Sequence, residues 1–373
     1  MNNSEKLNVL ASRLRTASTS SIKTFIGFDG FVDEVVHVVK KRYDADNFDR
    51  VEYMADYGNM IASAAGVSLN VELYPVRCKI GGNGPILANS LISHGLDITY
   101  MGACGKGTIN PVFEPLETKA HLISISDPAH TDAIEFLDGK IISCKLEPLR
   151  DVSWDNICKA VSKEQLAEMF ENNSALVFAN WTLVINSSDI WQHIIDDVLP
   201  NANLSKRKML FVDLADPSKR LESDVLRAMA QLSEFGKYFN VVLGLNKREA
   251  KLIASYLGSK KELDTLPDVA DYLAEHIGVS QVVVHTAKEA CASSNSKGRA
   301  QVATPFCEKP KQSTGAGDSF NAGYILGQVL GYTLEESLQL ATANAGFYIR
   351  NAYGGDKNEI ADFLELWSNG KLQ

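Results

Sequence analysis

Short apolar runs alternate with amphipathic helical patterns along most of the chain, and this alternation limits the possible folds more than any other feature. Residues that are apolar at consecutive positions are typical of parallel strands buried on both faces. Strand–helix alternation indicates a parallel sheet covered by helices, and therefore an α/β fold. We expect strands at 24–28, 98–101, 175–178, 209–214, 241–245 and 282–285, and helices near 85–94, 163–172, 189–198, 221–235, 247–257 and 266–276.

A second, smaller set of strands has a different pattern. Residues 71–80 alternate as a half-exposed strand does, and the segments 133–137 and 140–146 flank Asp138-Gly139, a strong hairpin signal. These strands predict a small sheet beside the main one, either as a flap over a site or as plain surface structure. Because no repeat or Pro-rich linker divides the sequence, we expect one domain over 1–373 with lid segments at about 33–80 and 131–146.

The composition excludes several classes of protein. Lys and Arg number 37 and Asp and Glu 46, so the net charge of −9 argues against binding to nucleic acid or to anionic membranes. Six scattered cysteines without a C-x-x-C pair, and seven histidines without ligand spacing, give little support to a zinc site. Reduced thiols and the lack of an apolar leader or spanning segment predict a cytoplasmic location.

The last third of the chain predicts closely packed helices. The segment 318–330 is apolar nearly all round, as expected of a buried central helix. Thr333 and Glu336 form a capping box for a helix over roughly 334–350, and 358–368 is amphipathic.

A glycine turn opens the predicted buried helix. Gly315, Ala316 and Gly317 allow close approach of the backbone to a ligand, and the free N–H groups of a helix start bind anions. Asp318 lies in the same turn. A carboxylate beside an anion hole suits phosphoryl transfer, because it takes a hydroxyl proton while the amides stabilise the moving charge. The alternative is that Asp318 simply caps the helix.

The string from Gly315 to Gly323, GAGDSFNAG, closely resembles the C-terminal signature of the ribokinase-like (PfkB) carbohydrate kinases. The resemblance spans roughly 24–355. It implies a Rossmann-like parallel-sheet sandwich with helices on both faces and a small β-strand lid. It also implies that Asp318 is the catalytic base, that Gly315, Ala316 and Gly317 form the anion hole, and that ATP and Mg²⁺ are used.

Further motifs are similar to the sugar-binding part of this family. Gly81-Gly82 resembles the N-terminal signature, although Ile86 stands where the family usually has Asn, so Asn83 is the candidate replacement. Near the end of the first strand, Asp33 is the better candidate for binding sugar hydroxyls and Asp29 the fallback. A loop carboxylate exposed to water is the alternative for Asp33.

The motifs that bind the nucleotide in this family are less completely present in this sequence. Asn246 and Glu249 resemble the N-x-x-E motif that organises phosphates and hydrated Mg²⁺, although such a motif alone is usually helix surface. The family glycines after Thr286 are absent, and Gln312 replaces an Asp that serves a monovalent-cation site, so the need for that cation stays open. By resemblance, the remaining ATP-binding candidates are Thr286, Lys288, Thr314 and Asn344.

The function predicted from these motifs is an ATP-dependent kinase acting on a hydroxyl of a small sugar, with edge strands of the lid available for a homodimer. Two alternatives remain. A nucleoside kinase would use aromatics of the long lid segment to stack a base, namely Tyr43, Phe48, Tyr53 and Tyr57. A degenerate sugar or nucleotide sensor would explain the departures at Ile86 and after Thr286, but has no need of a base. Turnover distinguishes the sensor, and a panel of acceptors distinguishes the kinases.

Overall fold

A nine-stranded sheet forms the centre of the protein in a computed structural model, which describes residues 2–204, 208–260 and 262–372. The seven strands from β12 to β6 are parallel, and β13 and β14 add an antiparallel edge. In spatial order the strands are β14 (Gly298–Ala303), β13 (Glu289–Ser294), β12 (Gln281–His285), β11 (Asn240–Asn246), β10 (Met209–Asp213), β9 (Ala175–Phe178), β1 (Lys23–Phe28), β5 (Asp97–Ala103) and β6 (His121–Ser126).

The six strands expected from the apolar runs are confirmed as β1, β5, β9, β10, β11 and β12. All four residues of β9 are buried, as a strand covered on both faces requires. The sheet has a hydrophobic core on each face, and successive side chains of a strand pack into opposite cores. In β11, Val241 and Leu243 pack on one face of the sheet and Val242 on the other. The pair β13–β14 was not predicted, because its Ala-, Ser- and Gly-containing sequence carries little strand signal.

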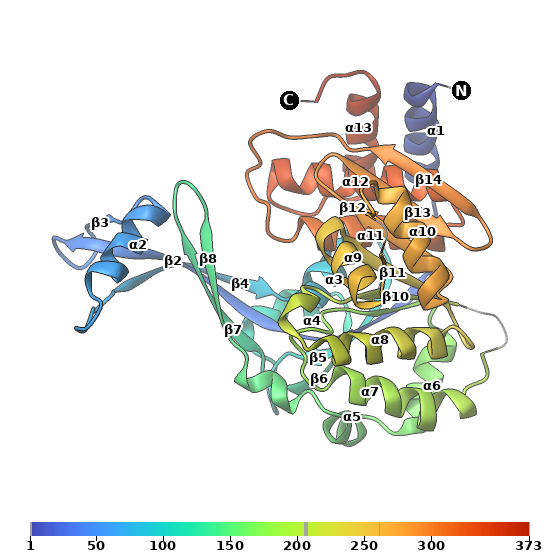
Figure 1. Ribbon diagram of the computed structural model, residues 1–373, viewed down its shortest axis with the longest axis horizontal. Helices are drawn as coiled ribbons and strands as arrows, with labels where there is room; N and C mark the ends of the chain where they lie inside the picture. Colours follow the sequence, from blue (N-terminus) through green and yellow to red (C-terminus); the bar gives the residue numbers. More distant parts are fainter. Residues whose placement is uncertain (1, 205–207, 261, 373) are drawn as a thin grey trace.

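Helices cover both faces of the sheet (Figure 1). One layer comprises α1 (Asn3–Thr16), α3 (Asn83–Ser93), α4 (Glu114–Glu117), α11 (Ala316–Val329), α12 (Leu334–Asn351) and α13 (Lys357–Ser368). The other comprises α5 (Trp154–Ala160), α6 (Lys163–Asn172), α7 (Ser187–His193), α8 (Glu222–Phe235), α9 (Lys247–Tyr256) and α10 (Leu266–Ile277). Short 3₁₀ segments lie at Pro111–Phe113, Glu147–Asp151, Leu199–Asn201 and Pro217–Lys219, and a π-helical turn at Ile194–Val198 extends α7. Among the described residues, no helix is long and apolar enough to cross a membrane.

The predicted central helix is confirmed as α11, which is buried from Asp318 to Gly327. Two of its glycines allow α12 to pack closely: a Cβ on Gly323 would lie 2.8 Å from the Cα of Ala341. The capping box of Thr333 and Glu336 is present at the start of α12. These helices hold the glycine turn at the N-terminus of α11 on a rigid support.

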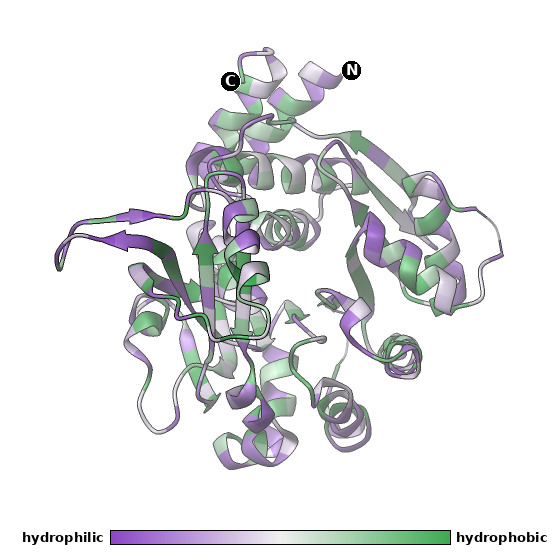
Figure 2. Ribbon diagram, turned by 60° about the vertical axis from the view of Figure 1, so that its left-hand side comes forward, coloured by the Kyte–Doolittle hydropathy of each residue, from purple (hydrophilic) through white to green (hydrophobic). Residues whose placement is uncertain are grey.

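A second, five-stranded sheet extends from the body (Figures 1 and 2). It contains β3 (Phe48–Arg50), β2 (Phe31–Arg42), β7 (Ala129–Glu135) and β8 (Lys140–Lys145) in that order, with β4 (Leu73–Gly81) paired to β2. The hairpin predicted at Asp138-Gly139 joins β7 to β8. Helix α2 (Met54–Ser63) packs on this sheet, where Tyr57 stacks near Phe136.

Strand alternation gives the small sheet two distinct faces. Its inner face, which turns toward the glycine turn, carries Asp33, Val35, Thr131 and Ile142. The outer face carries the residues between them along each strand. The inner face therefore brings residues of β2 and β7 to the N-terminus of α11.

Candidate active site

The glycine turn lies between two cavities. The first, of about 220 Å³, is lined by Thr314, Gly315 and Asp318 together with the inner face of the small sheet. The second, of about 380 Å³, is lined by Ser313, Ala316 and Gly317, and by residues of β12 and α12. A group held in the turn therefore has access to both cavities, which is the arrangement that a transfer between two ligands requires.

The backbone of the turn depends on its glycines. Gly315 is the N-cap of α11 with φ +90°, and a Cβ there would lie 2.7 Å from the hydroxyl of Tyr348. A Cβ on Gly317 would meet open space, so this side of the turn has room for a ligand. Among the described residues, no side chain caps α11. The N–H of Ala316 donates to the carbonyl of Ser313 at 3.2 Å, so an anion would be bound by the amides that follow Ala316.

Asp318 projects from the first turn of α11 and is 6% exposed. Asn83 donates through Nδ2 to its Oδ1 at 2.8 Å. Burial first, and then the negative charge of Asp213, raise the pKa of Asp318 well above its ordinary value. Raising the pKa makes the carboxylate a stronger base, and Asn83 fixes its orientation.

Asp29 is fully buried and organises the start of α3. Its carboxylate accepts from the backbone N–H groups of Asn83 at 2.8 Å and Gly84 at 2.9 Å, and from Nδ2 of Asn180 at 2.8 Å. Burial raises its pKa to about 6, against these hydrogen bonds, which lower it. The oxygens of Asp29 therefore accept hydrogen bonds from the protein itself. Asp29 also positions Asn83, whose side chain donates to Asp318.

Asp33 lies on the inner face of the small sheet and lines the first cavity with Lys79 and Thr131. Burial raises its pKa, while Lys79 and a hydrogen bond with Thr131 lower it. A Cβ on Gly81 would lie 2.2 Å from the Asp33 carboxylate, so the first glycine of the Gly81-Gly82 pair makes room for this side chain. Of the two aspartates, Asp33 is the one that faces the cavity.

Asn180 was not predicted from the sequence and also lines the first cavity. It adopts φ 58° two residues after the end of β9 and is 1% exposed. Its Nδ2 donates to Asp29, whereas its Oδ1 has no partner among the described residues. A buried acceptor at the cavity wall without a donor is suited to a ligand hydroxyl. An Asn after a strand is a common turn signal, so nothing in the sequence distinguishes Asn180 from an ordinary turn residue.

Acidic residues gather at the carboxyl end of β10 and the start of α9. Asn246 and Glu249 form a capping box, with Oε1 of Glu249 accepting from Nδ2 of Asn246 at 2.5 Å. Asp213, which the sequence reasoning missed, accepts from Nδ2 of Asn321 at 2.6 Å. Burial and the negative charge of Asp213 raise the pKa of Glu249 to about 8. Carboxylates whose charge the protein leaves this poorly compensated fit Mg²⁺, which prefers such oxygen donors.

The second cavity contains some of the predicted nucleotide-binding residues. Asn246 and Thr286 line it, with Phe306 and Phe320 among its apolar walls. Lys288 is exposed, and its Nζ lies 5.9 Å from the centre of the Phe306 ring. Thr314 lines the first cavity instead.

Asn344 is placed in the interior, away from both cavities. Its Nδ2 donates to Ser90 at 3.0 Å and to the carbonyl of Ser319 at 2.6 Å, and its Oδ1 lies 3.1 Å from Nε2 of His94. The side chain joins α12 to α3 and α11. This is the structural hydrogen-bonding role that an Asn among small residues often has.

Gln312 anchors the residue that precedes the glycine turn. Its Nε2 donates to the carbonyl of Thr314 at 3.2 Å and also to the hydroxyl of Tyr348, which itself donates to the same carbonyl at 3.0 Å. Two neutral side chains from outside the turn thus fix the peptide that precedes Gly315.

Comparisons with known proteins agree with this geometry. The family model of prokaryotic ketohexokinase matches residues 7–367. A ketohexokinase of Haloferax volcanii is 28% identical over 346 residues, which cover 91% of this chain and 90% of the relative.

Solved structures share the fold at lower identity. A carbohydrate kinase from Agrobacterium tumefaciens superposes with a TM-score of 0.63 at 16% identity, over 92% of this chain and 97% of the other. A ribokinase from Arabidopsis thaliana, solved with ribose and ATP, gives a TM-score of 0.61 at 14% identity, over 92% and 98%. The chain belongs to the prokaryotic ketohexokinase family and is a PfkB-type carbohydrate kinase.

Proposed function

We propose that this carbohydrate kinase transfers the γ-phosphoryl group of ATP to a hydroxyl of a ketohexose, with Asp318 as general base. The observation that carries the proposal is the glycine turn at the junction of two cavities, with a buried carboxylate of raised pKa beside it. The ketohexose as acceptor follows from the activity named for the family and for its Haloferax relative.

The sugar would occupy the first cavity. Asp33 and the free Oδ1 of Asn180 are acceptors for its hydroxyls, and Lys79 is a donor. One hydroxyl would lie against Asp318, which takes its proton as the oxygen attacks the γ-phosphorus. The bond from that phosphorus to the bridging oxygen of ATP breaks, and ADP leaves with the bridging oxygen.

The turn would stabilise the charge of the transferred group. The N-terminal amides of α11 lie at the positive end of the helix dipole, where they would donate to the oxygens of the transferred group. The nucleotide would extend into the second cavity, where Phe320 and the small residues of α12 offer an apolar wall to its base. Bound Mg²⁺, for which Glu249 and Asp213 are the candidate ligands, would offset the negative charge of the phosphates.

The small sheet would act as a lid. Its inner face supplies Asp33, Thr131 and Ile142 to the first cavity, so movement of this sheet toward the body would exclude water from the sugar. The four aromatics considered for stacking a nucleoside base do not line this cavity. Phe48 packs on Tyr74 and Tyr57 on Phe136, while Tyr43 and Tyr53 are exposed.

The test is ATP-dependent release of ADP with Mg²⁺, measured against D-fructose, other ketohexoses, aldohexoses, pentoses and nucleosides. We expect stimulation by a ketohexose and a loss of about 10²–10⁴-fold in kcat for Asp318→Asn. Analysis of the product by ³¹P and ¹³C NMR identifies the phosphorylated hydroxyl. Turnover with nucleosides alone, or an Asp318→Asn variant as active as the natural chain, would refute the proposal.

A further inference from the structure

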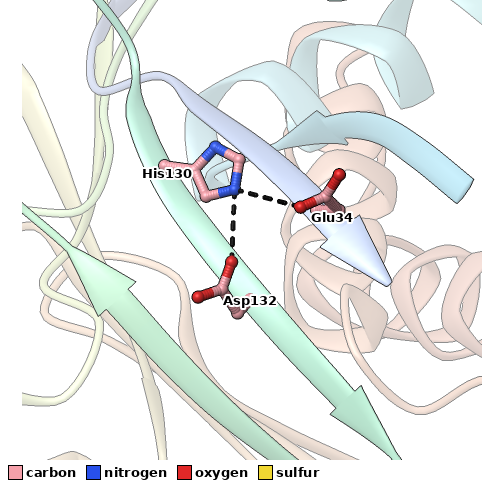
Figure 3. A group of neighbouring side chains, drawn as sticks. All are labelled: Glu34, His130 and Asp132. Carbon is pink, nitrogen blue, oxygen red and sulfur yellow. Dashed lines mark ion pairs between the residues drawn. The ribbon is translucent and has the colours of Figure 1, made fainter. Parts of the chain in front are cut away.

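A cluster of metal-ligating side chains lies on the outer face of the small sheet, outside the active site. Nε2 of His130 is 3.2 Å from Oδ1 of Asp132 and 3.6 Å from Oε2 of Glu34 (Figure 3). The three donor atoms lie within 4.8 Å of one another. They come from two adjacent parallel strands, Glu34 from β2 and the other two from β7. We propose that these three side chains form a binding site for a transition-metal ion such as Zn²⁺.

The chemistry of the donor set favours Zn²⁺ over Mg²⁺ or Ca²⁺. Imidazole nitrogen and carboxylate oxygen are both zinc ligands, whereas hard cations prefer oxygen donors alone, so the imidazole of His130 favours a transition metal. Cys78 is the exposed register partner of Glu34 on β4, but β4 pairs with β2 on the edge away from β7, so the three-residue cluster would leave the fourth coordination position to water.

Access to the cluster is open. Glu34 and His130 are about one-third exposed, at 32% and 37%, and Asp132 is 15% exposed. Lys145 occupies one side of the cluster, with its Nζ 2.7 Å from Oδ2 of Asp132. Its side chain is 62% exposed, and such an ion pair is weak, so an incoming cation displaces it at little cost.

The position of this site gives it a structural consequence. On β2, Glu34 directly follows Asp33, and on β7, His130 and Asp132 flank Thr131, the register partner of Asp33. Because neighbours along a strand point to opposite faces, the metal would lie directly behind the Asp33–Thr131 pair of the first cavity. An ion bound to both strands would tie β2 to β7 at the point where they hold Asp33.

The sequence could not show this cluster. His130 and Asp132 are two residues apart, a spacing without meaning until a strand aligns them, and Glu34 is 96 positions earlier than His130. Only the parallel pairing of β2 with β7 brings the three together.

The experiment is calorimetric titration of the full chain with ZnCl₂ in excess Mg²⁺, which occupies the oxygen-rich cluster around Glu249. We expect one equivalent of Zn²⁺ to bind, with affinity reduced at least about tenfold in His130→Ala and increased in Lys145→Ala, which removes the competing cation. His193→Ala is the matched control, because His193 pairs with a single carboxylate, Asp197, at 3.1 Å.

Hydrogen exchange provides a second readout that does not depend on activity. Zn²⁺ should slow exchange of the β2 and β7 amides in the natural chain but not in His130→Ala. Failure of the natural chain to bind Zn²⁺, equal affinity in His130→Ala, or exchange in these strands that Zn²⁺ does not change would overturn the proposal.

Discussion

Two aspartates four positions apart have opposite relations to the first cavity. Asp29 precedes β2 and is surrounded by protein donors, whereas Asp33 lies within β2 on the side that faces the cavity. The sequence could place both near the end of the first strand, but their roles follow from strand alternation and from the glycines. Gly84 leaves space for Asp29 and Gly81 for Asp33.

Substituting each aspartate by asparagine should separate folding from sugar binding. In Asp29→Asn an amide N–H₂ faces N–H donors, so we expect the free energy of unfolding to fall by about 2–5 kcal/mol. In Asp33→Asn we expect stability within about 1 kcal/mol of the natural chain and a rise of about 10–100-fold in the KM for sugar, because one charge-assisted hydrogen bond is weakened. Urea denaturation and steady-state kinetics measure the two effects. Loss of stability in Asp33→Asn with an unchanged KM would contradict this assignment.

At the scale of elements, helix α12 positions the backbone of the glycine turn through the side chain of Tyr348. Its hydroxyl donates to the carbonyl of Thr314 and lies 2.7 Å from the position that a Cβ on Gly315 would take. We expect Tyr348→Phe to lower kcat about fivefold, the equivalent of one neutral hydrogen bond, with the KM for sugar unchanged. Tyr353→Phe is the control, because that exposed hydroxyl bonds Glu359 instead. An increase in KM with an unchanged kcat would show that Tyr348 does not act through the turn.

The packing of α11 on α12 depends on glycines where the two helices are closest. A Cβ on Gly327 would lie 2.7 Å from Oγ and 2.8 Å from Cα of Ser337. We therefore expect Gly327→Ala to reduce the free energy of unfolding by about 1–3 kcal/mol. Gly58 in α2 has open space around it, so Gly58→Ala should be neutral or stabilise by up to about 1 kcal/mol through helix propensity. Equal denaturation midpoints for the two variants would contradict the packing argument.

For the whole molecule, the central sheet was predictable because its parallel strands must be apolar at every position. The same reasoning failed at the antiparallel edge, where Ala and Ser replace branched residues in β13. The glycine turn at the start of α11 was predictable because its glycines and the apolar helix that follows them are adjacent in the sequence. Asp213 and Asn180 were not, because each acts through contacts with residues far along the chain.

The charge distribution of the whole chain predicts how stability depends on pH. Glu249 has a pKa of about 8 in the folded protein against an ordinary value of 4.5. Between these values the folded state holds a proton that the unfolded state has released, so raising the pH favours unfolding. Burial lowers the pKa of His94 and of the partly buried His285 to about 4 from 6.5, so these side chains destabilise the fold only below about pH 6.5. Above that pH, Glu249 determines how the free energy of unfolding changes with pH.

We therefore expect the metal-free protein to lose stability as the pH rises from about 6.5 to about 8, where only the folded state holds a proton on Glu249, and the loss to level off above about pH 8 as the folded state releases that proton as well. Mg²⁺ should stabilise the protein more at the higher pH, because it binds the ionised carboxylates and competes with protons. Urea unfolding at both pH values, with and without Mg²⁺, measures this. Glu249→Gln should flatten the pH dependence and weaken the effect of Mg²⁺, although it also alters the capping box of α9. If Mg²⁺ stabilised the natural chain and Glu249→Gln equally at both pH values, Glu249 would not be a ligand, and the carboxylate cluster would have only a structural role.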